Sequence, residues 1–156
     1  MADLYPVAGS KIYIGGVLPT QSEDFVEEDF AGQAFEEIDG WETMGVIGDA
    51  AQIITTQLIN RGRDVKQKGT RNAGSMQNNF AVISDDAGQL ALIAAEKTPS
   101  NYAFKIEFND APGGPGAGTV GYFVGLVTSA QRAGGGANTV MMINSTVEIN
   151  SNIVLV

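Results

Sequence analysis

The sequence predicts a mainly β protein that carries one short α-helix. Three observations predict this class: several segments alternate apolar and polar residues, Val, Ile and aromatic residues gather in those segments, and Gly-rich stretches separate them. The chain has 156 residues. That length fits a single domain over 1–156 and is enough to bury a core without disulfides or metals.

The clearest strands lie between residues 101 and 149. NYAFKIEF (101–108) and VMMINSTVEI (140–149) alternate with a period of two, so each has one apolar face. TVGYFVGLV (119–127) is apolar on both faces, and we expect it at the centre of the fold or at a subunit contact. Gly-rich loops at 111–118 and 133–138 separate these strands. This part of the chain therefore predicts a meander. Four weaker strand candidates are SKIYIGG (10–16), AQIITTQLI (51–59), SMQNNFAVI (75–83) and NIVLV (152–156).

One helix is predicted in DDAGQLALIAAEKTP (85–99). Asp86 is a candidate N-cap, and Gln89 follows three residues later, which is the spacing of a capping box. Pro99 prevents the helix from continuing. The apolar stripe that we expect to pack on a sheet consists of Leu90, Ile93 and Ala94.

Two absences from the composition argue against catalysis. The chain contains no Cys, which removes disulfides, thiolate nucleophiles and zinc–sulfur sites. It contains no His, which removes the usual general base near neutral pH and the commonest transition-metal ligand. We therefore expect no enzyme activity, no cofactor and no metal.

The sequence gives no sign of a membrane protein. No apolar run reaches the roughly 18 to 20 residues that a membrane helix requires. MADLYPVAGSKIYIGG at the N-terminus lacks the basic start and apolar segment of a signal peptide. We expect no membrane insertion, and we expect synthesis in the cytoplasm.

Charge is unevenly distributed along the chain, which has a formal net charge of −9. Five of its nine Lys and Arg residues fall in NRGRDVKQKGTRNAG (60–74), and nine of its 18 Asp and Glu residues fall between positions 23 and 42. Both groups lie in what the sequence predicts to be a long loop region, about 20–75. The basic set is Arg61, Arg63, Lys66, Lys68 and Arg71. The acidic set is Glu23, Asp24, Glu27, Glu28 and Asp29.

Three interpretations of these charge runs compete. Both can be solvated faces that keep the protein soluble. The basic set can bind nucleic acid, although it lacks interleaved aromatic residues and lies in a strongly negative protein. The third interpretation is that the acidic set of one copy meets the basic set of another. An exposed ion pair contributes roughly 0 to 1 kcal/mol, so such a contact orients subunits while strand pairing and apolar burial hold them.

A resemblance to a known family favours the third interpretation. VKQKGTRNAGSMQNNFAVISDDAGQLALIAAEKTPSNYAFKIEF (65–108) contains a basic loop end, an alternating strand, a short helix and a Y-x-F-K-I-x-F strand. GYFVGLVTSAQRAGGGANTVMMINSTVEI (121–149) has the form of a closing hairpin. In this order of segments the chain resembles the major tail tube proteins of long-tailed, lambda-like phages.

The resemblance implies a β-sandwich or partly closed antiparallel barrel flanked by one short helix, a fold related to the tubes of contractile tails and type VI secretion. It further implies a structural virion protein of the phage tail. Six copies would form a ring, and rings would stack into an acidic tube through which DNA passes without specific binding. The implied partners are further copies of the chain, the tape measure protein and the tail-end proteins.

The resemblance places the basic set on a long loop between strands, docked on the acidic set of a neighbouring copy. We also expect residues 61–74 to be mobile before assembly and ordered afterwards, because they are polar and interrupted by Gly.

The main alternative is a carbohydrate-binding or adhesin-like β-domain. Such a domain would need exposed aromatic residues beside an acidic calcium site, and Trp41 lies between Asp39 and Glu42. A second alternative is a hydrolase that uses the carboxylates of Asp85 and Asp86. Adjacent acidic residues at a helix start are better explained as caps.

Overall fold

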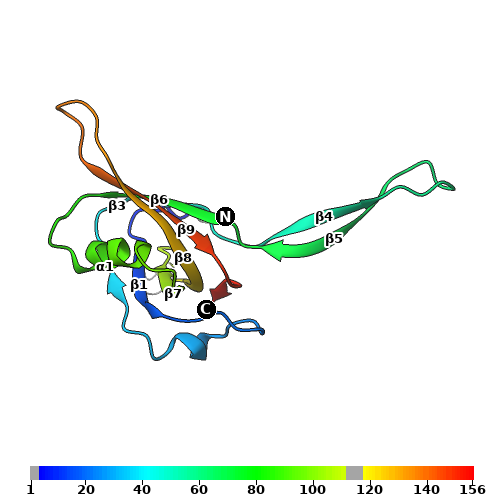
Figure 1. Cartoon of the computed structure of the whole chain (residues 1–156), viewed down its shortest axis with the longest axis horizontal. Coiled ribbons are helices and arrows are strands. Elements are labelled where there is room, and N and C mark those ends of the chain that lie inside the picture. Colours follow the sequence, from blue (N-terminus) through cyan, green and yellow to red (C-terminus); the bar gives the residue numbers. More distant parts are fainter. Residues whose placement is uncertain (1–3, 112–117) are drawn as a thin grey trace.

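The computed structural model describes residues 4–111 and 118–156 (Figure 1). Most of the Gly-rich loop predicted at 111–118 therefore lies outside the described residues. Among those residues, no helix is both long and apolar enough to cross a membrane. The elements in chain order are β1 (Lys11–Val17), the 3-10 helix η1 (Glu27–Phe30), β2 (Glu36–Glu37), β3 (Trp41–Thr43), β4 (Ala50–Thr56), β5 (Val65–Asn72), β6 (Ser75–Ala81), α1 (Ala87–Glu96), β7 (Tyr102–Glu107), β8 (Val120–Ala133), β9 (Met142–Ile149) and β10 (Val154–Leu155).

The predicted meander forms the centre of one antiparallel sheet. Its strand order is β2-β1-β7-β8-β9-β6-β3, and β10 also pairs with β8. β7, β8 and β9 are consecutive neighbours in this order, as the alternation between 101 and 149 predicts. The strands predicted from 10–16 and 75–83 are β1 and β6. The meander and the mainly β class are both confirmed.

The sheet curls until its two ends almost meet. β2 and β3 lie at opposite ends of the strand order, yet only residues 38–40 separate them in the chain. Ile38 N still donates to Ile12 O of β1 at 2.9 Å, and Gly40 O already accepts from Ala81 N of β6 at 2.7 Å. A flat sheet of this order could not place its edges a few residues apart. The fold is therefore the partly closed antiparallel barrel that the resemblance implies.

Two apolar clusters lie on opposite sides of the sheet, and β8 contributes to both. Phe123 and Val127 belong to the larger cluster, inside the curl, where Phe123 stacks on Phe104 of β7 at 5.2 Å between ring centroids. Val124 is buried on the other side, in a smaller cluster that includes Phe30 of η1. This arrangement explains why the sequence of β8 is apolar on both faces.

Helix α1 begins where the sequence predicts but buries a different face. The carboxylate of Asp86 accepts a hydrogen bond from Gln89 N at 2.9 Å, so the predicted N-cap is confirmed. Of the predicted stripe, Ile93 packs against the larger cluster, but Leu90 is 54% exposed and Ala94 is exposed. Leu92, which the prediction left out, is 1% exposed. The residues that α1 buries are Gly88, Gln89, Leu92 and Ala95.

The buried face of α1 is selected by the seam between the two ends of the barrel. The Gln89 amide donates to Asp39 O at 2.8 Å and to Ala81 O at 2.7 Å, and its oxygen accepts from Ile83 N at 3.0 Å. The capping box predicted for Gln89 is therefore not formed, because its side chain makes hydrogen bonds to both ends of the barrel instead. Gly88 packs so close to β2 that an added Cβ would collide with Glu37 O.

Candidate assembly surface

One hairpin stands apart from the barrel. β4 and β5 pair with each other in a separate two-stranded antiparallel sheet. Figure 1 shows this hairpin projecting from the body, with the turn between its strands at the far end. We call residues 50–72 the arm, and the remainder of the chain the body. Five basic residues and one acidic residue, Asp64, give the arm a net charge of +4, which leaves −13 on the body from the total of −9.

The arm joins the body through a glycine at each end. Gly48 precedes β4 with φ +135°, and Gly74 follows β5 with φ +77°, in the left-handed region that favours glycine. A Cβ added at either position would meet no atom within 4 Å. Asn72 Oδ1 accepts a hydrogen bond from Gly74 N at 2.8 Å. Local backbone conformation therefore sets the direction in which the arm leaves the body.

The two faces of the arm differ in chemistry. Directly opposite residues of paired strands point to the same face. Lys66 and Lys68 lie opposite Thr55 and Ile53, so this face is basic. The other face carries Ile54 and Val65, which lie opposite Gln67 and Thr56.

The arm exposes large apolar side chains. Ile53 is 69% exposed, Ile54 is 44% exposed, and Ile59 at the turn is fully exposed, with a relative accessibility of 106%. An isolated two-stranded hairpin is at best marginally stable in water, since it buries too little apolar surface. The arm therefore has the properties of a surface that is completed by another molecule.

The structure corrects the predicted loop. Val65–Asn72 is strand β5, paired along its length with β4, so Lys66, Lys68 and Arg71 lie on a strand. Arg61 and Arg63 lie in the turn at the tip. The prediction failed because polar residues and a Gly are typical of loops, whereas here the cross-strand partner imposes the extended conformation.

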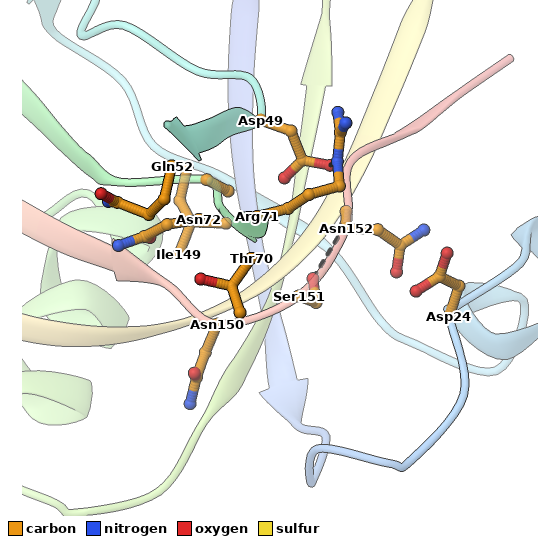
Figure 2. Close-up of a pocket in the computed structure, with 11 residues that line it drawn as sticks. Asp24, Asp49, Gln52, Thr70, Arg71, Asn72, Ile149, Asn150, Ser151 and Asn152 are labelled. Carbon is orange, nitrogen blue, oxygen red and sulfur yellow. Dashed lines mark hydrogen bonds and ion pairs between the residues drawn. The ribbon is translucent and has the colours of Figure 1, made fainter. Parts of the chain in front are cut away.

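Arg71 lies at the base of the arm, beside a polar hollow of about 550 Å³ (Figure 2). Its Nε is 3.3 Å from Oδ2 of Asp49, and the two side chains are 61% and 26% exposed. Asp24 of the acidic set lines the same hollow. The structure thus brings one residue of each predicted set to a common hollow, although Arg71 pairs with Asp49.

The acidic set is displayed on a segment that is anchored by its aromatic residues. Phe25 and Phe30 are 5% and 2% exposed, and Phe30 stacks on Tyr122 of β8 at 5.1 Å between ring centroids. Asn152 fixes the backbone of Phe25, because its Oδ1 accepts from Phe25 N at 2.8 Å and its Nδ2 donates to Phe25 O at 3.0 Å. Glu27, Glu28 and Asp29 lie between these anchors and Glu23 and Asp24 directly precede them, so the anchors hold the whole acidic set on one surface.

Within 4–111 and 118–156, two ion pairs form: Arg71 with Asp49, and Lys105 with Glu107. Neither joins the basic set to the acidic set. Contact between the two sets therefore stays a prediction about assembly, and Arg71 of the basic set is already paired within the chain.

Sequence reasoning missed the apolar part of this surface. AQIITTQLI appears above as a weak strand candidate, and β4 confirms a strand over most of it. The exposure of Ile53, Ile54, Leu58 and Ile59 was not foreseen. One feature pointed to it: IITT places two apolar residues and then two polar residues in succession, so neither face can be buried alone.

The calcium-site alternative finds no support at Trp41. The ring is partly buried against the larger apolar cluster, and Nε1 donates to Asn78 Oδ1 at 3.2 Å. The described residues contain no group of three acidic side chains that could hold a metal ion. In the hydrolase alternative, Asp86 is occupied as the cap of α1.

No protein-family model matches the chain, and no curated protein matches it. Solved structures do match. A chain of the anti-feeding prophage baseplate, from a six-fold symmetrised cryo-EM structure, aligns with TM-score 0.71 and 10% identity over 100% of this chain and 97% of that one. A chain of an extracellular contractile injection system, the PVC sheath/tube terminator in its extended state, aligns with TM-score 0.70 and 11% identity. This alignment covers 99% of this chain and 98% of that one.

A phage tail tube is also similar. The SPP1 tail tube protein aligns with TM-score 0.65 and 13% identity over 96% of this chain and 78% of that one. At such identities the likeness shows the fold alone. The chain therefore has the fold of phage tail tubes and contractile injection systems, as the resemblance at 65–149 implies.

Proposed function

We propose that this chain is the structural subunit of a phage tail tube, and that its copies associate through the arm. The arm carries the proposal, because it exposes apolar side chains on a thin two-stranded sheet that a single chain leaves uncovered. The fold supports the same role, since the similar solved structures are components of tails and injection systems. A structural role needs no catalytic group.

In this proposal six copies form a ring, and rings stack into the tube of a long-tailed phage. An arm and the surface that receives it are unlike, so each contact is head-to-tail, and such contacts close into rings or continue as filaments. The six-fold symmetry of the similar baseplate structure supports a ring of six.

DNA passes through this tube without specific binding. The body carries −13 of the formal charge, and a negative wall avoids the counterion release by which basic surfaces hold DNA. The finished protein resides in the virion tail, beside the tape measure and tail-end proteins.

The basic set of one copy faces the acidic set of another in this arrangement. Replacing Arg61, Arg63 and Lys66 with Glu would then block assembly, because three attractions become repulsions. Adding Glu27→Lys and Glu28→Lys to that variant would restore part of the assembly. Normal tubes from the triple variant, counted by electron microscopy, would refute this pairing.

The overall proposal is tested by negative-stain electron microscopy of the purified chain. The expected images show rings or hollow tubes. A variant in which a short Gly-Ser link replaces residues 53–68 keeps the barrel and loses the arm, so it should remain monomeric with an unchanged melting temperature. Wild-type protein that stays monomeric at high concentration, at low and high salt and with tail partners present, would overturn the proposal.

Amide exchange tests the expected ordering of residues 61–74. Their amides should exchange rapidly in the free subunit and slowly in the tube, since assembly covers both faces of the arm. Equal protection in the two states would contradict this expectation.

A further inference from the structure

An apolar groove lies on the body beside the base of the arm. It is a hollow of about 560 Å³, lined by Ile47, Phe108, Ile153 and Leu155, with Asp49 and Asp110 among its polar residues. Phe108 and Asp110 also line a second hollow beside Tyr5 and Val7, which extends the groove toward the N-terminal segment. Leu155 is 62% exposed. Ile47, Phe108 and Ile153 are partly buried, so an apolar side chain that entered the groove would contact them and cover Leu155.

The tip of the arm offers a side chain of matching chemistry. Ile59 is fully exposed, and Leu58 beside it is 38% exposed. Burying an aliphatic side chain of this size contributes about 1.5–3 kcal/mol. Burial of Ile59 in a contact between copies would add this free energy to the stability of each contact.

The arm cannot deliver Ile59 to its own groove. Gly48 and Asp49, which line the groove, lead directly into β4, and Ile59 lies beyond the other end of that strand. At about 3.3 Å per residue, the nine steps from Ala50 to Ile59 span roughly 30 Å when extended. Figure 1 shows the arm directed away from the body along this length. A tip can therefore reach this groove only on a second copy.

Charge distinguishes the groove from other apolar surface. The tip carries Arg61 and Arg63, whereas Asp110 lies at the groove. Asp110 Oδ1 accepts a hydrogen bond from Thr119 N at 2.7 Å, and this bond holds the pKa of the carboxyl below its usual value. Asp110 therefore remains ionised at neutral pH and can attract the tip.

We propose that the arm tip of one copy seats Ile59 in the apolar groove of a second copy, with Arg61 and Arg63 at the acidic border of the groove, which includes Asp110 and Asp49 and continues to Asp24 of the acidic set. This contact rests on the proposed function and names the surfaces that join successive subunits. Asp49 lines both the groove and the polar hollow that contains Asp24, so the receiving surface continues toward the acidic set. Because tip and groove are unlike, the contact repeats from copy to copy.

Ile59→Asp tests the tip, and Asn60→Asp is its matched control. Both substitutions add one negative charge to the exposed turn, but only the first removes the apolar anchor. Ile59→Asp should raise the concentration for half-maximal assembly about tenfold or more, as measured by light scattering. Asn60→Asp should change it much less, and circular dichroism should show both variants folded. Equal shifts in the two variants would overturn the proposal.

Engineered cysteines test the groove directly, because the native chain contains no Cys. Under mild oxidation, Ile59→Cys combined with Leu155→Cys should give a ladder of disulfide-linked multimers on a non-reducing gel. Leu90→Cys, on the exposed face of α1, replaces Leu155→Cys in the control, which should give no ladder.

The outcomes separate this contact from the proposed function. Wild-type tubes together with no ladder from the Ile59–Leu155 pair would overturn the groove and leave the tube role standing. A ladder from Ile59→Cys with Val26→Cys instead would place the tip on the acidic segment; it would overturn the groove and leave the pairing of the basic and acidic sets standing. Wild-type protein that never assembles would overturn both.

Discussion

The body and the arm are both built from antiparallel strands, yet they bury their residues very differently. Ile12 of β1 is 1% exposed, whereas Ile53 of β4 is 69% exposed. The body carries both apolar clusters. The arm carries most of the basic residues and has no cluster of its own. The difference shows that contacts within one chain hold the body together, whereas one chain leaves the apolar side chains of the arm uncovered, as the proposed contact with other copies requires.

The largest expected effect comes from the centre of the body. Phe123→Ala removes a fully buried ring that stacks on Phe104, so it should lower the free energy of unfolding by about 3–5 kcal/mol. Urea denaturation of the monomeric, arm-deleted protein measures this value. A loss below 1 kcal/mol would mean that the barrel is held by something other than its apolar cluster.

The seam should be the next most sensitive part of the body. Gln89→Leu keeps the bulk of a 2% exposed side chain but leaves Ile83 N, Asp39 O and Ala81 O without their partner. Unsatisfied buried groups cost about 1–3 kcal/mol each. We expect the free energy of unfolding to fall by about 2–4 kcal/mol, less than the full sum, because some of these groups can form hydrogen bonds with water instead. Asp86→Ala removes the cap and the hydrogen bond that Asp86 Oδ2 accepts from Asp39 N at 3.1 Å, and should cost about 1–2 kcal/mol. A smaller loss for Gln89→Leu than for Asp86→Ala would contradict the role of the seam.

A pH-dependent effect is expected on the outer face of β1. Tyr13 donates to Glu107 Oε2 at 3.2 Å, and burial together with the Glu107 charge raises the pKa of Tyr13 to about 12, from 10.0. A raised folded-state pKa gives stability that is complete below pH 10 and is lost as the pH rises toward 12.

Tyr13→Phe removes this contribution. Wild type should be more stable than the variant by about 1 kcal/mol below pH 10, and the gap should close between pH 10 and 12. Absorbance titration near 295 nm should lose one tyrosine that titrates at about 12. A gap that stays constant over this pH range would show that the hydroxyl does not act through its protonation.

The smallest effect on the free subunit should come from the arm. Ile53→Ala should change the free energy of unfolding of the monomer by no more than about 0.5 kcal/mol, because the side chain is largely in water. The same substitution should weaken assembly measurably in light scattering. An effect on the monomer as large as that of Phe123→Ala would erase the distinction between arm and body.

The sequence predicts the parts of this fold whose order is set by local alternation. Residues 101–149 alternate clearly, and they form adjacent strands of the sheet. Closure of the barrel could not be predicted from residues alone, because β2 has two residues and β3 has three, too few for a periodic pattern. The face of α1 was mispredicted for a related reason. Close backbone approach at Gly88 and three hydrogen bonds of Gln89 fix that face together with buried Leu92 and Ala95, and the apolar pattern alone does not reveal the first two.

The candidate site was predictable in charge and not in shape. The basic and acidic sets each cluster within a short segment, and this clustering follows directly from the positions of the charged residues in the sequence. Strand β5 contains Lys66, Lys68 and Arg71 because it pairs with β4. The residue pattern of β5 itself does not predict this pairing. Exposure of Ile59 depends on the distance between the turn and the body, which is a property of the folded chain.

Gly48 and Gly74 at the base of the arm are positions at which small changes in backbone dihedral angles would rotate the whole arm. A rotation of about 10° there would move a tip roughly 30 Å away by about 5 Å. The space around Gly48 and Gly74 is open, so such a rotation would mainly disturb the Arg71–Asp49 ion pair and the buried Ala73 at the base of the arm. In the proposed tube, small rotations of this kind would let the subunit spacing change along a bend while each barrel keeps its shape.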